Sequence, residues 1–162
     1  MFPAPLLKSA ETLLDACRDA GLTLTTAESC TGGLIAALLT EIPGASDVFD
    51  RGFITYSNQA KSDMLGVPPD LLARHGAVSE PVAAAMAAGA LKAAGAGLAV
   101  AVTGIAGPGG GTADKPVGMV CFGLALGARA PIAETRRFGG ACRQQVRLKT
   151  VEYAVVIAAR HL

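Results

Sequence analysis

The segment ESCTGG, residues 28–33, combines a nucleophilic hydroxyl with a turn rich in backbone N–H groups. It follows a Thr- and Leu-rich stretch and precedes an apolar helical stretch. N–H groups at a helix N-terminus bind anions, and glycines let a ligand approach the main chain. A hydroxyl here could attack a carbonyl whose developing oxyanion the same N–H groups hold. The alternative is that Ser29 or Thr31 caps the helix and the glycines only form the turn.

A serine nucleophile needs a base, and Lys61 is the best candidate in the sequence. His75 ends a short polar helix before a glycine, and His161 is the penultimate residue, so neither is well placed. A lysine can act as a base only where burial keeps it neutral near pH 7. Lys61 closely follows Tyr56 and Asn58 at the end of an expected strand. The alternative is a solvated lysine on a helix.

Cys30 is a rival nucleophile beside Ser29, but no histidine partner is suggested near it, and a buried cysteine is the commoner arrangement. The four cysteines show no CxxC spacing, and two histidines cannot complete a zinc site with them. The sequence therefore predicts no metal site. We interpret the cysteines as reduced, as in a cytoplasmic protein.

Two further features could contact a ligand. The loop 104–116 follows the most apolar expected strand, and ligands of open α/β sheets bind beyond the carboxyl ends of strands. It matches neither the P-loop nor the GxGxxG pattern, so a long hairpin-like connection is an equal alternative. Arg143 and Arg147 lie one turn apart near the start of the last helix. They could bind a phosphate together, or they could be solvated surface residues. A positive charge near a helix N-terminus is unfavourable because of the helix dipole, so the presence of two arginines there slightly favours a functional role.

These residues are positioned by helices that alternate with strands. A continuous apolar run, GLAVAVTG at 97–104, is typical of a strand buried on both faces. Asn58 is expected to cap a short helix, and Gly139-Gly140 to open the last one. The pattern predicts one domain over residues 1–162, a three-layer α/β/α sandwich with a mixed, mostly parallel sheet of about five strands. The expected strands are 22–28, 48–56, 97–104, 117–126 and 131–138. One expected helix precedes them near 6–17, and others lie between them near 33–42, 58–65, 69–75 and 81–95.

Composition excludes several classes of protein. The 162 residues carry 14 Lys and Arg against 13 Asp and Glu, and there is no Trp, so we expect no nucleic-acid partner. The N-terminus shows no signal peptide, and the uncharged run 93–113 contains seven glycines and a proline, so we expect no membrane insertion. Few charges and high apolar content suggest a homodimer or higher homo-oligomer in the cytoplasm.

Four ordered motifs, spread over nearly the whole chain, carry a resemblance to a known family. The sequence is similar to the CinA C-terminal domain family, whose stand-alone members are nicotinamide-nucleotide amidases. The motifs are AESCTGG (27–33), GFITYSNQAK (52–61), GAVSEPVA (76–83) and AVTGIAGPGGGTADKPVG (101–118).

The resemblance implies a serine amidohydrolase in which Ser29 is the nucleophile and Lys61 its base, with Tyr56 helping to orient or deprotonate. It implies that Arg143 binds the nucleotide phosphate. The family usually has an acidic residue directly before this arginine, where the present chain has Cys142. The substrate-contacting residues that it implies are Cys30, Thr31, Gly32, Gly33, Asn58, Thr103, Gly104, Gly107 and Arg143.

The implied reaction is hydrolysis of the carboxamide of nicotinamide mononucleotide to nicotinate mononucleotide and ammonia, through an acyl-enzyme and without metal or organic cofactor. Two alternatives of other classes remain open. One is a non-catalytic pyridine-nucleotide-binding module, which would bind the nucleotide without releasing ammonia. The other is a structural partner domain that uses its Ala-rich faces in an oligomer.

Overall fold

A five-stranded sheet with the order β2-β1-β3-β4-β5 forms the centre of the computed structural model, which describes residues 1–162. Strands β2, β1 and β3 are parallel, whereas β4 pairs antiparallel with β3 and with β5. Four strands therefore run in one direction, which confirms the predicted mixed, mostly parallel sheet. The strands are β1 Leu24–Glu28, β2 Phe49–Ile54, β3 Leu98–Gly104, β4 Met119–Leu126 and β5 Ile132–Arg137.

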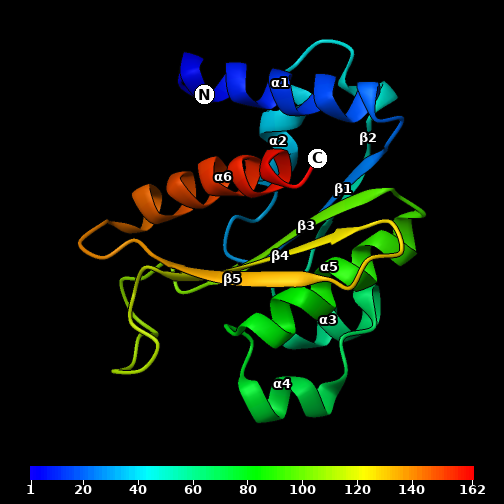
Figure 1. The fold of residues 1–162 in the computed structure, drawn as a ribbon. Helices are drawn as coiled ribbons and strands as arrows, with labels where there is room; N and C mark the ends of the chain where they lie inside the picture. Colours follow the sequence, from blue (N-terminus) through cyan, green and yellow to red (C-terminus); the bar gives the residue numbers. More distant parts are fainter.

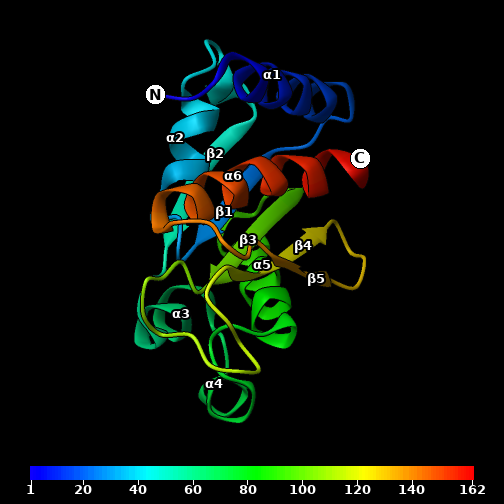
Figure 2. The same cartoon turned by 90° about the vertical axis from the view of Figure 1, so that its left-hand side faces the viewer.

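Helices cover both faces of the sheet, as the three-layer prediction requires. Helices α1, α2 and α6 lie on one face, and α3, α4 and α5 lie on the other (Figure 1, and turned by 90° in Figure 2). None of these helices combines the length and the apolarity needed to cross a bilayer. The helices are α1 Ala4–Asp19, α2 Leu34–Thr40, α3 Asn58–Leu65, α4 Pro69–His75, α5 Glu80–Ala94 and α6 Arg143–Arg160, with a 3₁₀ turn η1 at Ala45–Asp47.

Strand β3 shows how the sequence sets the spacing of the layers. Side chains alternate between the faces of a strand, so the large residues Leu98, Val100 and Val102 join the core under α1, α2 and α6. The small residues Ala99 and Ala101 face α5 on the other side and join a separate core there. Because these side chains are small, α5 can pack close to the sheet.

Two glycines mark the closest approaches of α5. A Cβ added to Gly123 of β4 would lie 2.0 Å from the carbonyl oxygen of Ala83, and one added to Gly89 would lie 2.0 Å from that of Leu65 on α3. Any larger residue at either position would therefore push α5 away from its neighbours.

The carboxyl ends of three parallel strands meet at one edge of the sheet. Glu28 of β1 pairs with Ile54 of β2 and with Val102 of β3. The next residues, Ser29, Thr55 and Thr103, therefore lie side by side at this edge of the sheet, Ser29 and Thr55 just after their strands and Thr103 among the last paired residues of β3. The connection after β1 passes over one face and the connection after β2 over the other, so β1 and β3 flank a topological switch point, where open α/β sheets bind ligands (Figure 1).

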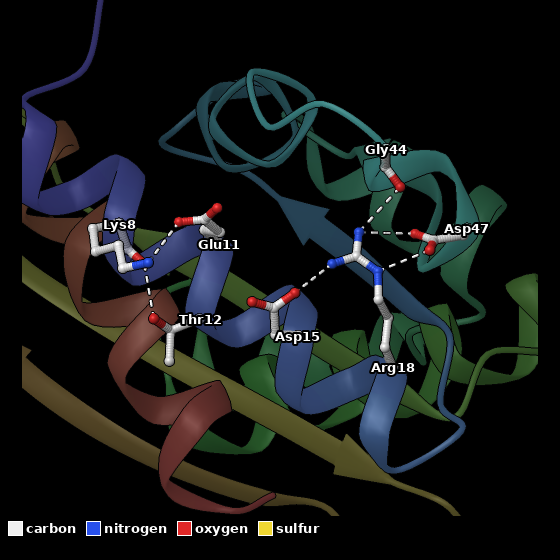
Figure 3. A network of polar contacts seen from close by, with 7 residues as sticks. All are labelled: Lys8, Glu11, Thr12, Asp15, Arg18, Gly44 and Asp47. Atoms are coloured by element: carbon white, nitrogen blue, oxygen red, sulfur yellow. Dashed lines mark hydrogen bonds and ion pairs between the residues drawn. The ribbon is translucent and has the colours of Figure 1, made fainter.

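A polar network ties α1 to the loop that leads back to β2 (Figure 3). Arg18 donates from Nε and Nη2 to the carboxylate of Asp47, at 2.8 and 3.0 Å. It also donates to Asp15 at 2.6 Å and to the carbonyl oxygen of Gly44 at 3.1 Å. Arg18 is a structural arginine, and its partners lie on α1 and in this loop.

Two predicted helix starts are wrong in detail. Ser57, not Asn58, caps α3, since its hydroxyl accepts the N–H of Ala60 at 3.0 Å and Asn58 is already the first helical residue. Helix α6 begins at Arg143 with Cys142 as its N-cap, rather than at the preceding glycines. The glycines instead belong to the turn that leads from β5 into α6.

Candidate active site

Ser29 and Lys61 meet although 32 residues separate them in sequence. The side-chain nitrogen of Lys61 lies 3.0 Å from Ser29 Oγ, within hydrogen-bond distance, and donates to the carbonyl oxygen of Thr55 at 2.8 Å. Ser29 follows β1 and faces α3, which carries Lys61 on its buried side. Lys61 is 1% exposed and Ser29 is 8% exposed, so the pair is shielded from solvent.

Burial governs the charge of Lys61. Desolvation lowers the pKa of Lys61 below its ordinary value, and no carboxylate acts in the opposite direction. Its two hydrogen-bond partners, a hydroxyl and a carbonyl, carry no charge. This is the environment in which a lysine amine can lose its proton near neutral pH and accept one from a hydroxyl.

Cys30, the rival nucleophile, lies in an environment that keeps its thiol protonated. Burial raises the pKa of Cys30 to about 12, with a smaller contribution from the Glu28 carboxylate. Because the thiolate is the reactive form, the thiol stays inert at neutral pH. The geometry favours Ser29 over Cys30 as the nucleophile.

A buried carboxylate, which the motif reading missed as a functional group, anchors the turn after Ser29. Glu28 is 1% exposed. Its carboxylate accepts the hydroxyl of Thr31 at 2.6 Å and the N–H groups of Gly33, Ile35 and Ala36 at 2.9–3.0 Å. These are donors of the turn and of the first turn of α2, so a negative charge sits at the positive end of the helix.

The alternative that Ser29 or Thr31 caps α2 is therefore wrong. The N-cap of α2 is Gly33, and neither Ser29 nor Thr31 caps the helix, because the side chain of Glu28 takes that role. Gly32 and Gly33 have φ of 59° and 99°, in the left-handed region that glycine adopts without strain. The glycines thus turn the chain sharply, and the Ser29 hydroxyl is not used to cap the helix.

Two N–H groups of the turn remain without a protein acceptor. The N–H of Gly32 donates to the carbonyl oxygen of Ser29 at 3.1 Å and that of Leu34 to Thr31 at 3.3 Å. The N–H groups of Gly33, Ile35 and Ala36 donate to the carboxylate of Glu28. Only the N–H groups of Cys30 and Thr31, which directly follow the hydroxyl, donate to no protein acceptor; Cys30 lines the cavity beside Ser29, whereas Thr31 is fully buried. An oxyanion hole needs donors in this position.

A cavity of about 200 Å³ opens beside the pair. It brings together eight residues that the sequence singled out, whereas Thr31, Gly32, Gly33 and Gly107 do not line it. Sequence reasoning did not assign Ala77, Val78 or Ala106, although all three lie within the family motifs quoted above. The lining residues are Ser29, Cys30, Tyr56, Asn58, Lys61, Ala77, Val78, Thr103, Gly104, Ala106 and Arg143.

Tyr56 and Arg143 form the rim of this cavity. The Tyr56 hydroxyl accepts from Arg143 Nη2 at 3.1 Å and makes no hydrogen bond with Ser29 or Lys61. Arg143 Nη1 donates to the carbonyl oxygen of Gly107 at 2.8 Å. The start of α6 therefore lies beside the loop after β3, as Figure 2 also shows. Neither contact neutralises the guanidinium, so Arg143 presents a positive charge at the cavity mouth.

Arg147 lies one turn further along α6 and points to a different partner. It donates from Nε to the carbonyl oxygen of Cys30 at 3.1 Å and from Nη2 to that of Thr31 at 2.9 Å. Arg143 lines the cavity and Arg147 does not. The structure thus separates two arginines that the sequence could not tell apart.

No three His, Cys, Asp or Glu side chains of the chain gather as a metal-binding group. The four cysteines are free, with Cys17, Cys30 and Cys121 buried and Cys142 exposed. The hydroxyl of Thr103 donates to the carbonyl oxygen of Ala77 at 2.9 Å. This bond holds the segment before α5 against the end of β3, where both residues line the cavity.

The sequence model of the CinA C-terminal domain matches residues 6–162. The chain belongs to the CinA C-terminal domain family. It is 49% identical over 155 residues to the nicotinamide-nucleotide amidohydrolase PncC of Escherichia coli, and the match covers 96% of this chain and 93% of that protein. A relative in Symbiobacterium thermophilum, named for competence and damage induction, is 53% identical over 152 residues, but the chain spans only 35% of its length.

Solved structures of the family have the same fold. The competence/damage inducible protein CihA of Agrobacterium tumefaciens superposes with a TM-score of 0.95 at 48% identity, covering 99% of this chain and 97% of that one. A CinA superfamily protein of Escherichia coli gives a TM-score of 0.93 at 33% identity, covering 100% and 94% of the two chains.

Proposed function

We propose that this protein is a nicotinamide mononucleotide amidase, which releases ammonia from the carboxamide through an acyl-enzyme on Ser29. The observation that carries the proposal is the 3.0 Å contact between Ser29 Oγ and Lys61 Nζ, with Lys61 buried and without a carboxylate partner. The substrate class is supported by the amidohydrolase of Escherichia coli, which matches the chain almost from end to end.

The first steps of the reaction form the tetrahedral intermediate, which becomes the acyl-enzyme when ammonia leaves. Neutral Lys61 takes the proton of the Ser29 hydroxyl as the oxygen attacks the amide carbon. The carbonyl oxygen of Thr55 accepts a hydrogen of the amine and so holds its lone pair towards Ser29. The negative charge that develops on the substrate oxygen is held by the N–H groups of Cys30 and Thr31, and such a donor contributes roughly 10²–10³ in rate.

The second half releases the products. Lys61, now protonated, delivers its proton to the amide nitrogen, which leaves as ammonia and breaks the C–N bond. Water then attacks the ester carbon while Lys61 again accepts a proton. Collapse of the second tetrahedral intermediate returns a proton to Ser29 Oγ and frees nicotinate mononucleotide. No step requires a metal or an organic cofactor.

Substrate binding divides between the cavity and its rim. A cavity of about 200 Å³ is small beside the roughly 300–1,000 Å³ of most ligand sites, so it would take the pyridine ring and leave the phosphate at the mouth. Arg143 is the cation there. Asn58, Thr103 and Gly104 line the cavity and would contact the ring or the carboxamide. Tyr56 would then act by orienting Arg143 rather than by moving a proton.

Ammonia release from nicotinamide mononucleotide, measured after chelator treatment, tests the proposal. The wild type should release ammonia, and Ser29→Ala and Lys61→Ala should each abolish release while keeping the fold. Lys61→Arg should be inactive as well, since a guanidinium keeps its proton. Near-normal turnover by Lys61→Ala would refute the role of the base. Nucleotide binding without any ammonia release from the wild type would instead favour the non-catalytic binding module.

A further inference from the structure

Arg147 holds the main chain of the turn that carries the nucleophile. Its guanidinium donates to the carbonyl oxygens of Cys30 and Thr31, the two residues directly after Ser29. It forms no ion pair with a carboxylate, unlike Arg18, which binds Asp15 and Asp47. A half-buried cation that is directed only at backbone carbonyls therefore lies behind the turn.

Peptide geometry connects this contact to the other side of the turn. The C=O of Cys30 and the N–H of Thr31 belong to one planar trans peptide, in which the two groups point in opposite directions. With the Arg147 guanidinium on the oxygen, the N–H of Thr31 points away from that guanidinium. That N–H is one of the two that donate to no protein acceptor, and the other belongs to Cys30.

We propose that Arg147 is a positioning residue that orients and polarises the Cys30–Thr31 peptide, so that its N–H donates to the oxyanion formed by Ser29. The inference rests on the proposed function. A cation bonded to the carbonyl oxygen polarises the peptide and makes its N–H a stronger donor, since chains of hydrogen bonds reinforce one another. Arg147 would thus stabilise the transition state through a peptide bond, and Arg143 alone would meet the phosphate.

A purely structural tether between α6 and the turn would predict different behaviour. Loss of a tether lowers the melting temperature but leaves the folded enzyme with its normal kcat. Loss of the positioning contact lowers kcat and leaves KM for the nucleotide unchanged, because the contact acts in the transition state and not in substrate binding. Loss of a phosphate ligand would instead raise KM.

The test compares Arg147→Met and Arg147→Lys with the wild type. A lost oxyanion donor costs roughly 10²–10³ in kcat, and a misoriented donor should cost less, about tenfold to a hundredfold, with KM unchanged. Lysine keeps the charge and can reach one carbonyl, so it should recover part of the loss. Arg18→Met is the matched control, since it removes a structural arginine that also binds a loop carbonyl, and it should lower the melting temperature without lowering kcat.

Sulfonylation of Ser29 by phenylmethylsulfonyl fluoride separates this inference from the proposed substrate. The sulfonyl oxygens need the same N–H donors, so the rate should fall in Arg147→Met even if the wild type does not hydrolyse the nucleotide. A folded Arg147→Met protein with wild-type kcat and wild-type sulfonylation would overturn the inference. If the methionine variant does not fold, Arg147→Lys takes its place, and a wild-type kcat there would overturn it equally.

Discussion

Replacing Lys61 with methionine should abolish turnover and also change how the free energy of unfolding depends on pH. Methionine keeps the apolar stem of the side chain but has no titratable group. Burial lowers the pKa of Lys61 in the folded protein. In the unfolded chain the pKa returns to about 10.4. The wild type therefore has a linkage between folding and protonation at this position, and the variant has none.

The sign of the effect follows from counting protons. Between the two pKa values, the unfolded chain holds a proton on Lys61 that the folded protein has lost. Raising the pH through this window therefore stabilises the folded wild type, by up to about 1.4 kcal/mol per pH unit. Below the folded-state pKa both states are protonated, and Lys61 contributes no slope.

Buried thiols act in the opposite direction, so the difference between the two proteins has to be measured. Burial raises the pKa of Cys17 to about 11 and that of Cys30 to about 12. Unfolded thiols ionise near pH 8.5, so these cysteines lower the stability above about that pH. Wild type and variant share all four cysteines, so subtracting their curves leaves the contribution of Lys61 together with its charge coupling to Cys30.

The contacts of Lys61 set the magnitude at low pH. The variant loses the hydrogen bonds to Ser29 and Thr55, at about 1 kcal/mol each. It also removes a buried ammonium, which costs the folded wild type about 1.4 kcal/mol for each unit by which burial lowers the pKa. The two effects oppose each other below the folded-state pKa, so the variant loses less stability there than the missing hydrogen bonds alone would cost.

Urea titrations of both proteins from about pH 6.5 to about pH 9.5 give the two stability curves. The kcat/KM of the wild type, measured over the same range, should rise through the folded-state pKa of Lys61, since the base must be neutral. The pH at which the stability difference begins to grow and the pH of the kinetic rise should coincide. Parallel stability curves for the two proteins would refute the assignment of Lys61 as a base held neutral by burial.

Three further predictions concern the residues around the pair. Arg143→Met should raise KM for the mononucleotide more than it lowers kcat, and steady-state kinetics should show no such rise for the riboside, which lacks the phosphate. Glu28→Gln should cost roughly 2–3 kcal/mol in urea denaturation, because an NH₂ would face N–H donors; exposed Glu11→Gln is the control and should change little. Cys30→Ala should keep most of the turnover, and iodoacetamide at neutral pH should not inactivate a Cys142→Ser protein, from which the exposed thiol has been removed; loss of activity in either experiment would argue for a catalytic thiol.

The sequence by itself determined the order of the elements and the faces of the strands. The alternation of Leu98, Val100 and Val102 with two alanines gives β3 one face of large side chains and one face of small side chains, and α5 packs on the small face. Such patterns work because side-chain periodicity is a local property of the backbone. The serine after β1 and the lysine on α3 could be singled out in the same way, as the right residue types near strand ends.

Tertiary structure decided the chemistry of those residues. No local pattern shows that Lys61 is buried without a carboxylate, or that its nitrogen meets Ser29, because both depend on how α3 packs beside the end of β1. The same holds for Glu28, which resembles an ordinary strand-end residue in the sequence, and for Arg147, whose partners lie 116 and 117 positions away. The desolvation of a side chain and the orientation of a peptide bond are fixed only when distant segments pack together. In this proposal, desolvation makes Lys61 the base, and the orientation of the Cys30–Thr31 peptide gives Arg147 its role.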